Sequence, residues 1–179
     1  MKNWTTHSRT TALDNGKFLK VEHHDVEFDE GHRVEEWPWV VTPDYINVVV
    51  RLENGDFLVF RQSKYAIEGD SWAIVGGYIE PGEDPLEAAK RELMEETGHE
   101  ATSWTPLGCY VVDANRGFCK AYPFLATGAR KVNEPDADDL EKYEILTMPK
   151  NELTQTLKEG GFKVLPWATA VALALPHLD

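Results

Sequence analysis

The sequence predicts an α/β fold in which a mixed β-sheet lies between helices, preceded by an N-terminal β-hairpin extension. A strongly β-branched run at residues 44–52 is followed by an Asn-Gly turn and a second apolar run, which is the pattern of a β-hairpin. A capped amphipathic helix begins after Asp84, and an Ala- and Leu-rich segment closes the chain at residues 166–175. Strands interleaved with one early and two late helices favour a sheet covered on both faces.

Composition restricts the class of protein. The chain has 179 residues, 42% of them hydrophobic, which suits a globular domain with one core. Its formal net charge of −13 disfavours a nucleic acid polymer or an anionic membrane as a general partner. No apolar run reaches membrane length, and the N-terminus carries no apolar signal region. Cys109 and Cys119 form no metal-binding pattern and are expected to be reduced, so the sequence predicts a cytoplasmic location.

Residues 1–41 are predicted to form a separate strand-rich extension, and residues 42–179 the main domain. Residues 18–28 alternate loosely between apolar and polar side chains, with turn signals on both sides. A second short strand carries Trp37 and Trp39. These tryptophans either pack within the hairpin, contact a second copy of the chain, or stack on a nucleobase.

The other elements follow from apolar runs between turn residues. Helices are expected at residues 150–159 and 166–175, and a turn at residues 113–117. Further strands are predicted at residues 57–60, 72–75, 105–112, 119–126 and 143–148.

The best-defined element is a loop, a helix and a stop in the middle of the chain. Residues 76–82 are rich in glycine and proline and are predicted to be the loop. Asp84 is a favourable N-cap, Pro85 suits the first helical position, and Glu87 completes a capping-box pattern. Gly98 can end the helix in the left-handed conformation. The residues expected on the buried face are Leu86, Ala89, Leu93 and Thr97.

Three glutamates crowd together on the other side of this helix. Glu92 and Glu96 are one turn apart and Glu95 neighbours Glu92, so that their like charges repel. They also lie towards the negative end of the helix dipole, where carboxylates are disfavoured. A bound cation would remove this conflict, and a cluster of hard oxygen ligands suits Mg²⁺ or Mn²⁺ rather than zinc. The alternative is a solvated acidic face with Arg91 and Lys90 as partners.

Loop and helix together match the pattern G-x5-E-x7-R-E-U-x-E-E-x-G-U, where U is usually aliphatic. This pattern is the Nudix box, and here the chain resembles the Nudix hydrolases. Only the last position departs, because it is occupied by His99. The resemblance implies an α/β/α sandwich and metal-dependent hydrolysis of a diphosphate linked to another moiety. The matching residues are Gly77, Glu83, Arg91, Glu92, Leu93, Glu95, Glu96 and Gly98.

The resemblance also implies a role for each matching position. Glu92 and Glu96 are the principal ligands, and Glu83 and Arg91 are expected to hold the loop to the helix by an ion pair. The expected metal ligands are Glu92, Glu95, Glu96 and the backbone carbonyl of Gly76. The expected structural residues of the box are Gly77, Glu83, Arg91 and Gly98.

The general base of this family often lies in a loop after the box. The acidic stretch of residues 134–141 is the expected source, with Asp136 and Asp138 as first choices. A box glutamate, Glu95, is the alternative base, and Glu96 is expected to be catalytic through the metal. The other alternative for the stretch is a solvated acidic loop.

A second resemblance narrows the substrate. The segment FRQSKY at residues 60–65 is similar to the RQ-x-[RK]-Y segment of the ADP-ribose and nucleoside-diphosphate-sugar pyrophosphatases. This implies a small nucleotide-diphosphate substrate and a homodimer formed with the N-terminal strands. Arg61, Trp39 and Arg116 are the expected substrate contacts, although Arg61 and Arg116 also suit a surface and a turn. The Glu and Pro of the subgroup's Glu-Leu-Pro-Ala-Gly segment are absent from residues 73–77.

Two other functions stay open. One is a Nudix hydrolase for another substrate, such as a nucleoside triphosphate, a dinucleoside polyphosphate, NADH or a coenzyme A compound. The other belongs to a different class, a nucleotide-sugar-binding Nudix domain without turnover. Polymeric capped RNA is disfavoured because the chain offers no basic track.

Overall fold

The structure is a computed structural model that describes residues 4–28, 31–136 and 143–178. The chain divides into two compact units, of which the first comprises Met1–Asp44 and Tyr110–Lys120 and the second comprises Tyr45–Cys109 and Ala121–Asp179. Residues 110–120 were predicted to belong to the main domain. They join the first unit through contacts such as the hydrogen bond from the Val40 N–H to the Arg116 carbonyl, at 2.9 Å.

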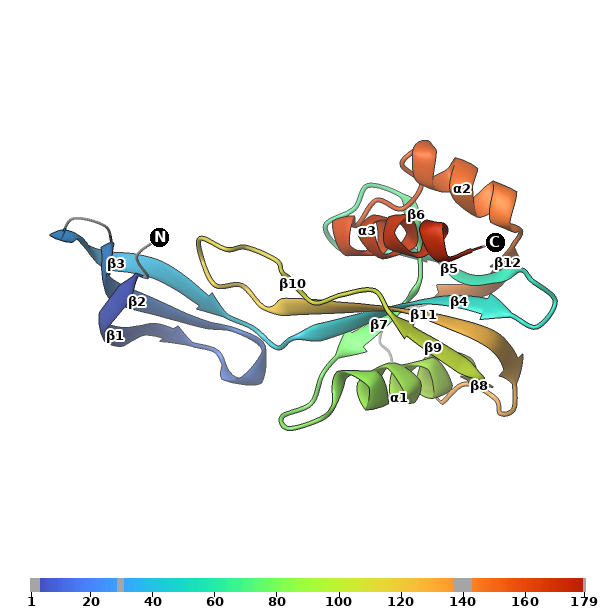
Figure 1. Cartoon of the computed structure of the whole chain (residues 1–179), viewed down its shortest axis with the longest axis horizontal. Coiled ribbons are helices and arrows are strands. Elements are labelled where there is room, and N and C mark those ends of the chain that lie inside the picture. The colour runs from blue at the N-terminus through green and yellow to red at the C-terminus, as the bar shows by residue number, and fades with distance from the viewer. Residues whose placement is uncertain (1–3, 29–30, 137–142, 179) are drawn as a thin grey trace. The chain divides into compact units, whose positions relative to one another are not determined.

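The first unit contains a three-stranded antiparallel sheet in the order β1-β2-β3, drawn in blue in Figure 1. The strands are β1 (Thr5–Asp14), β2 (Lys20–Phe28) and β3 (His32–Val41), and a short 3-10 helix, Gly16–Phe18, joins the first two. The predicted hairpin corresponds to β2 and β3, but β1 was missed. Every residue of β1 is exposed, so its sequence lacks the apolar alternation that reveals a half-buried strand.

The second unit is built on a mixed sheet in which neighbouring strands follow the order β11-β4-β5-β12. Strand β4 (Tyr45–Leu52) runs parallel to β11 (Lys120–Lys131) and antiparallel to β5 (Phe57–Ser63). The last strand, β12 (Tyr143–Met148), coincides with the predicted strand at residues 143–148 and pairs with β5. The short strands of this unit are β6 (Asp70–Ala73), β7 (Val75–Tyr78), β8 (His99–Glu100) and β9 (Ser103–Pro106), whereas β10 (Tyr110–Val111) belongs to the first unit.

One predicted strand is interrupted. Residues 105–112 were expected to be continuous, whereas the structure has β9 and β10 separated by residues 107–109. Gly108 lies between them with φ at +128°, a backbone conformation that side-chain-bearing residues rarely adopt and that ends the extended run.

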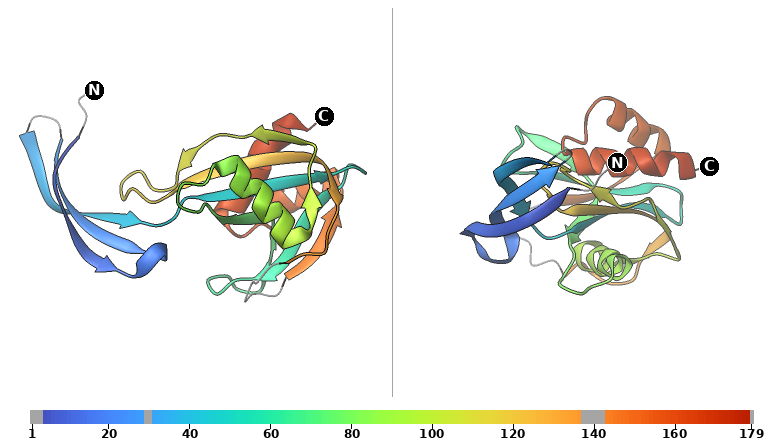
Figure 2. Two further views of the ribbon diagram at one scale, coloured as in Figure 1. Left: turned by 90° about the horizontal axis from the view of Figure 1, so that it is seen from below. Right: turned by 60° about the vertical axis from the view of Figure 1, so that its left-hand side comes forward.

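Helices cover both faces of the mixed sheet (Figures 1 and 2). Helix α1 (Pro85–Thr97) lies on one face, and α2 (Lys150–Lys158) and α3 (Leu165–Ala174) lie on the other; a 3-10 turn, Leu175–His177, follows α3. The core between them is formed by fully buried aliphatic side chains of β4 and β5 together with Leu93 of α1 and Val171 of α3. In the described ranges, no helix is long and apolar enough to cross a membrane.

Candidate active site

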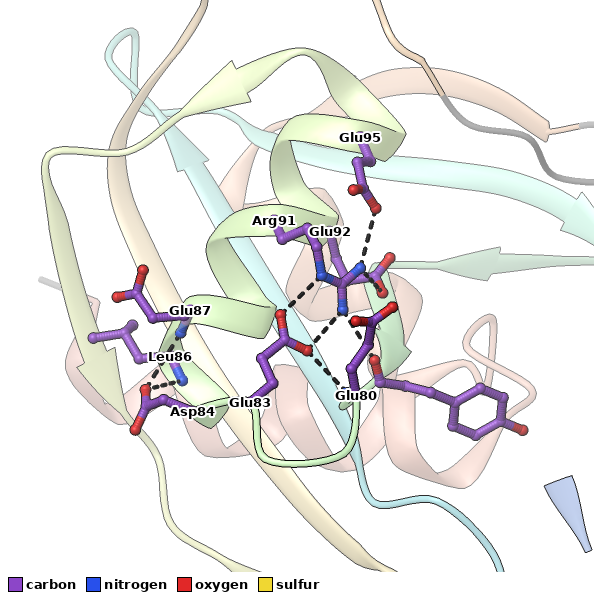
Figure 3. A network of polar contacts seen from close by, with 9 residues as sticks. Glu80, Glu83, Asp84, Leu86, Glu87, Arg91, Glu92 and Glu95 are labelled. Carbon is purple, nitrogen blue, oxygen red and sulfur yellow. Dashed lines mark hydrogen bonds and ion pairs between the residues drawn. The ribbon is translucent and has the colours of Figure 1, made fainter. Parts of the chain in front are cut away.

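Helix α1 begins and ends where its sequence dictates. The Asp84 carboxylate accepts hydrogen bonds from the backbone N–H groups of Leu86 (2.9 Å) and Glu87 (3.3 Å), as Figure 3 shows. Gly98 adopts φ 69° and its N–H donates to the Met94 carbonyl, which confirms the predicted left-handed stop. Of the predicted capping box, the Asp84 side chain caps the helix, whereas the Glu87 carboxylate accepts a hydrogen bond from Lys90 at 2.7 Å.

The buried face of α1 positions the glutamates. Ala88, Ala89, Leu93 and Thr97 are buried, and Leu86 packs at the margin of the core. The helix is thereby fixed in rotation against the sheet, so Glu92, Glu95 and Glu96 belong to its remaining surface. The Glu92 side chain is only 15% exposed, whereas the Glu95 side chain is 47% exposed.

A single guanidinium, that of Arg91, connects the loop and the acidic side of the helix (Figure 3). Its Nε and Nη2 atoms donate to the two oxygens of Glu83, at 2.9 and 3.0 Å. Its Nη1 donates to Glu92 (2.8 Å) and to Glu95 (3.1 Å), and Nη2 also reaches the Tyr78 carbonyl (3.1 Å). The structure thus places the predicted partners Glu83 and Arg91 in a bidentate ion pair that ties the loop to the helix.

The charges of this pair support each other. The hydrogen bonds from Arg91 hold the pKa of the Glu83 carboxyl below its usual value, and the Glu80 N–H adds to this effect. Glu83 is in turn the largest cause that raises the pKa of Arg91, followed by Glu92. Both groups stay ionised at neutral pH, and Arg91 compensates part of the repulsion among the glutamates.

Two glycines of β7 bring the sheet close to α1. Gly76 and Gly77 were predicted to be loop residues, but they pair with Asn47 and Ile46 of β4. A Cβ atom on Gly77 would lie 2.1 Å from the Glu92 carboxylate, and one on Gly76 would lie 2.5 Å from the Asn47 amide nitrogen. These two positions of β7 require glycine, because a residue with a side chain would overlap Glu92 or Asn47.

Glu96 is held by the same strand. Its carboxylate accepts a hydrogen bond from the Gly76 N–H at 3.2 Å. The structure therefore brings together Gly76, Gly77, Glu92 and Glu96, for which the sequence predicted metal-binding and structural roles.

The segment that contains the candidate base Asp136 is attached to the end of α1. The Asp136 N–H donates to the Glu95 carbonyl at 2.9 Å, and the N–H groups of Val132 and Asn133 donate to the Gly98 carbonyl at 2.8 and 3.0 Å. Residues from both elements line an open pocket of about 490 Å³. Glu95 and Asp136, two of the three candidate bases, thus line one pocket. Asp138 lies outside the described residues.

The donor set fits a hard divalent cation in chemistry, but it is not arranged as a finished metal site. Among residues 4–28, 31–136 and 143–178, no three carboxylate, imidazole or thiol groups converge closely enough to hold a metal ion. Arg91 Nη1 contacts Glu92 and Glu95 instead. A cation bound to Glu92 or Glu95 would compete with Arg91 for that carboxylate. The two hydrogen bonds from Arg91 to Glu83 could remain in place.

Arg61, a predicted substrate contact, is paired with a carboxylate in the structure. Its guanidinium forms an ion pair with Asp70 of the neighbouring strand at 3.0 Å, and its side chain is 55% exposed. The strand register pairs Arg61 with Trp72 and Glu144. Since successive side chains alternate between sheet faces, Arg61 points away from the face of its neighbours Phe60 and Gln62.

Trp39 lines a pocket of the first unit with a volume of about 270 Å³. Its ring stacks on the buried His24 at 4.9 Å between centroids, and the Gly117 backbone approaches so closely that a Cβ atom there would overlap the indole. Arg116 forms an exposed ion pair with Asp113 at 2.9 Å within its own turn. His24 was assigned no role from the sequence. The alternation of side chains along β2 was the signal that could have identified it as an inward-facing residue.

The chain is similar to known proteins over most of its length. A model of the NUDIX domain matches residues 41–168. A hydrolase from Streptomyces rubellomurinus, the CMP-5'-(N-acetyl-N-hydroxy-3-aminopropyl)phosphonate hydrolase, is 30% identical over 162 residues, which are 90% of this chain and 77% of that protein. The ADP-sugar pyrophosphatase of Mus musculus is 36% identical over 114 residues, which are 58% of this chain and 51% of the mouse enzyme.

A solved structure confirms the fold. The crystal structure of an ADP compounds hydrolase superposes with a TM-score of 0.82, covers 99% of this chain and 95% of its own, and is 23% identical. The predicted α/β fold with a mixed sheet is therefore confirmed.

Proposed function

This chain belongs to the Nudix family of pyrophosphohydrolases, and on that basis we propose that it cleaves the pyrophosphate bond of a nucleoside diphosphate linked to another moiety. ADP-ribose or a nucleoside-diphosphate sugar is the proposed substrate, because the mouse relative is named an ADP-sugar pyrophosphatase. Nudix hydrolases generally use divalent metal ions, and we propose Mg²⁺ or Mn²⁺ here. The observation that carries the proposal is the acidic side of α1, where Arg91 joins Glu92 and Glu95 to Glu83 and the Gly76 N–H holds Glu96.

The residues of the chain have distinct proposed roles in this reaction. Glu92, Glu96 and the Gly76 carbonyl would hold the cation, assisted by Glu95. A bound divalent cation neutralises phosphate oxygens and lowers the pKa of its water. Glu95 or Asp136 would act as the general base, since both line one pocket at the end of α1. Asp138 is retained as a candidate base from the sequence.

Arg91 and Glu83 are proposed to act on the geometry of the site. The Glu83–Arg91 pair is bidentate and keeps the loop of residues 79–84 against the helix. Gly77 leaves the space that the Glu92 carboxylate occupies. Gly98 allows the backbone of residues 133–134 to pass the helix end.

Substrate contacts are proposed for Trp39, Arg61 and Arg116. Trp39 is best supported, because its ring lies in a pocket lined by aromatic side chains and Arg9. Arg61 and Arg116 have carboxylate partners in Asp70 and Asp113, from which they would have to be released to reach a phosphate. A homodimer formed through residues 1–41 and a cytoplasmic location stay predictions, the first of which light scattering of the purified chain would test.

A second candidate substrate has its own support. The Streptomyces rubellomurinus relative covers 90% of this chain and is named for a CMP-linked phosphonate. A nucleoside monophosphate joined to a phosphonate presents two adjacent phosphorus centres to the same acidic helix. This candidate differs from the first in the base and in the leaving group.

Product analysis by mass spectrometry tests the proposal. The purified chain is incubated with ADP-ribose, ADP- and UDP-sugars, a CMP-linked phosphonate, NADH, dinucleoside polyphosphates and nucleoside triphosphates, with Mg²⁺ or with chelator. We expect AMP and ribose 5-phosphate from ADP-ribose, and no product in chelator. Glu96→Gln should be inactive, whereas Glu87→Gln, an exposed glutamate of the same helix, should retain activity.

The possible outcomes separate the alternatives. Preference for another diphosphate would keep the metal chemistry and reject the assigned substrate. Full activity in Glu96→Gln on every substrate would reject the mechanism. Tight binding of nucleotide sugars without any product would favour the binding domain.

A further inference from the structure

The carbonyl groups in the last turn of α1 have partners outside the helix. The final carbonyl groups of a helix have no hydrogen-bond donor within the helix and need one elsewhere. The Thr97 carbonyl lies 2.9 Å from Nδ1 of His99, so the residue that departs from the box pattern contributes to the turn. The carbonyl of Glu96 accepts a hydrogen bond from the hydroxyl of Tyr143, at 3.1 Å. Among these contacts, the last joins strand β12 directly to a proposed metal ligand.

We propose that Tyr143 is a positioning residue for Glu96, an inference that rests on the proposed function. Glu96 is held at two points by two different strands. Gly76 of β7 donates to its carboxylate at 3.2 Å, and Tyr143 of β12 donates to its main-chain carbonyl at 3.1 Å. The first contact fixes the carboxylate, and the second fixes the backbone from which the side chain extends.

The hydroxyl of Tyr143 can act in this way because its own ring is fixed. The ring packs against Phe60 at 4.8 Å between centroids, with the planes inclined by 42°. The backbone of Tyr143 pairs with the buried Gln62 of β5, at the start of β12. The position of the hydroxyl oxygen is thus set by the sheet and not by the helix that it contacts.

The consequence concerns metal affinity. A cation site needs ligand oxygens in a narrow range of positions, and partners that orient a ligand contribute strongly to affinity. Without the Tyr143 hydroxyl, the end of α1 would lose its attachment to β12, and Glu96 and Glu95 would sample more positions. The cation would then bind more weakly, while substrate recognition elsewhere would be unaffected.

Tyr143→Phe removes only the hydroxyl and keeps the ring beside Phe60. Thr154→Val is the matched control, because it removes a hydroxyl bond of 2.8 Å to a helix carbonyl, that of Lys150 in α2. The dissociation constant of Mn²⁺ alone is measured for the full chain by electron paramagnetic resonance titration. We expect Tyr143→Phe to weaken Mn²⁺ binding about tenfold and Thr154→Val to leave it unchanged. In turnover assays with saturating Mg²⁺, the KM for substrate should stay close to that of the wild type.

The results separate this inference from the function on which it rests. If the wild type binds Mn²⁺ and Tyr143→Phe binds it with the same dissociation constant, the role of Tyr143 alone is overturned. An equal loss in Thr154→Val would overturn it too, since the effect would then be one of general stability. A wild-type chain that binds no Mn²⁺ would overturn both the proposed function and the inference. A loss of Mn²⁺ affinity in Tyr143→Phe but not in Thr154→Val would support the role of Tyr143. Partial recovery of the affinity in Tyr143→Trp, whose ring keeps a hydrogen-bond donor, would support it further.

Discussion

The acidic helix and the three-stranded sheet of the first unit are both candidate binding regions, and they are built in opposite ways. In the helix region the decisive contacts are local, since the Glu83–Arg91 pair spans eight residues and the Asp84 cap only two or three. In the first unit, Nε1 of Trp37 donates to the Asn115 carbonyl at 2.6 Å across 78 residues of chain. The helix region can therefore be recognised in a short stretch of sequence, whereas the aromatic pocket exists only after folding.

This difference suggests a division of roles. The local region contains the hard oxygen donors that hydrolysis of any diphosphate needs. The pocket of the first unit contains aromatic rings and Arg9, which suit the part of a substrate that differs between family members. Variants in each region should therefore change different kinetic constants.

Among the glycine variants, Gly77→Ala should have the largest effect on turnover, because its Cβ atom would lie 2.1 Å from the carboxyl carbon of Glu92. The carboxylate would have to move away from its place beside β7. We expect a fall in kcat of about 10- to 100-fold, measured under saturating substrate and Mg²⁺. A double-mutant cycle with Glu92→Gln tests whether the loss acts through Glu92, since Gly77→Ala should lower kcat little further once Glu92 is changed. Independent, additive losses would contradict this account.

Gly98→Ala should have the next largest effect, on stability. A Cβ atom would meet the Asn133 carbonyl oxygen at 2.0 Å, and Gly98 has φ at +69°. Gly82→Ala is the control, with φ at +83° and no atom within 4 Å. Urea unfolding should show a loss of about 1 kcal/mol for Gly82→Ala and at least about 3 kcal/mol for Gly98→Ala. Equal losses would mean that the loop of residues 132–136 is not held by the helix end.

Gly117→Ala tests the first unit. Its Cβ atom would overlap the Trp39 indole at 1.8 Å and displace it from the pocket, whereas Gly16→Ala, with φ at +72°, meets nothing within 4 Å. We expect Gly117→Ala to raise the KM several-fold, by roughly 1 kcal/mol of binding free energy, with little change in kcat. Gly16→Ala should leave both constants unchanged. A fall in kcat without a change in KM would place Trp39 outside substrate binding.

The Glu83–Arg91 pair should give the smallest effect, visible as a dependence of stability on pH. Because the hydrogen bonds from Arg91 lower the folded-state pKa of Glu83, its contribution is complete above its ordinary pKa and is lost as the pH falls through the folded-state value. We expect the wild type to exceed Glu83→Gln by about 1 kcal/mol in free energy of unfolding at neutral pH. The difference should shrink below about pH 4. A difference that is constant down to about pH 3 would argue against this ion pair.

The sequence was sufficient to predict elements whose signals are local. The helix from Asp84 to Gly98 has its cap, its buried face and its stop within one continuous segment, and all three were confirmed. The β4–β5 hairpin was equally evident, because β-branched residues flank the turn of residues 53–56.

The sequence was insufficient where structure depends on distant partners. The glycines of β7 look like a loop until β4 is placed beside them. Strand β1 has an exposed, polar sequence and is defined only by its pairing with β2. The contact from Tyr143 to Glu96 joins residues 47 positions apart and leaves no local pattern. Asp70 as the partner of Arg61 was missed for the same reason, since it depends on the register of β5 and β6.

The comparison of the two regions is tested most directly by measuring kcat and KM for Glu96→Gln and Trp39→Leu on two substrates that share a diphosphate but differ in the base. We predict that Glu96→Gln lowers kcat at least about 100-fold on both substrates, because the cation site acts on the diphosphate. Trp39→Leu should raise the KM to a different extent for each base and leave kcat nearly unchanged. Unchanged turnover in Glu96→Gln on either active substrate would contradict the assignment of hydrolysis to the acidic side of α1.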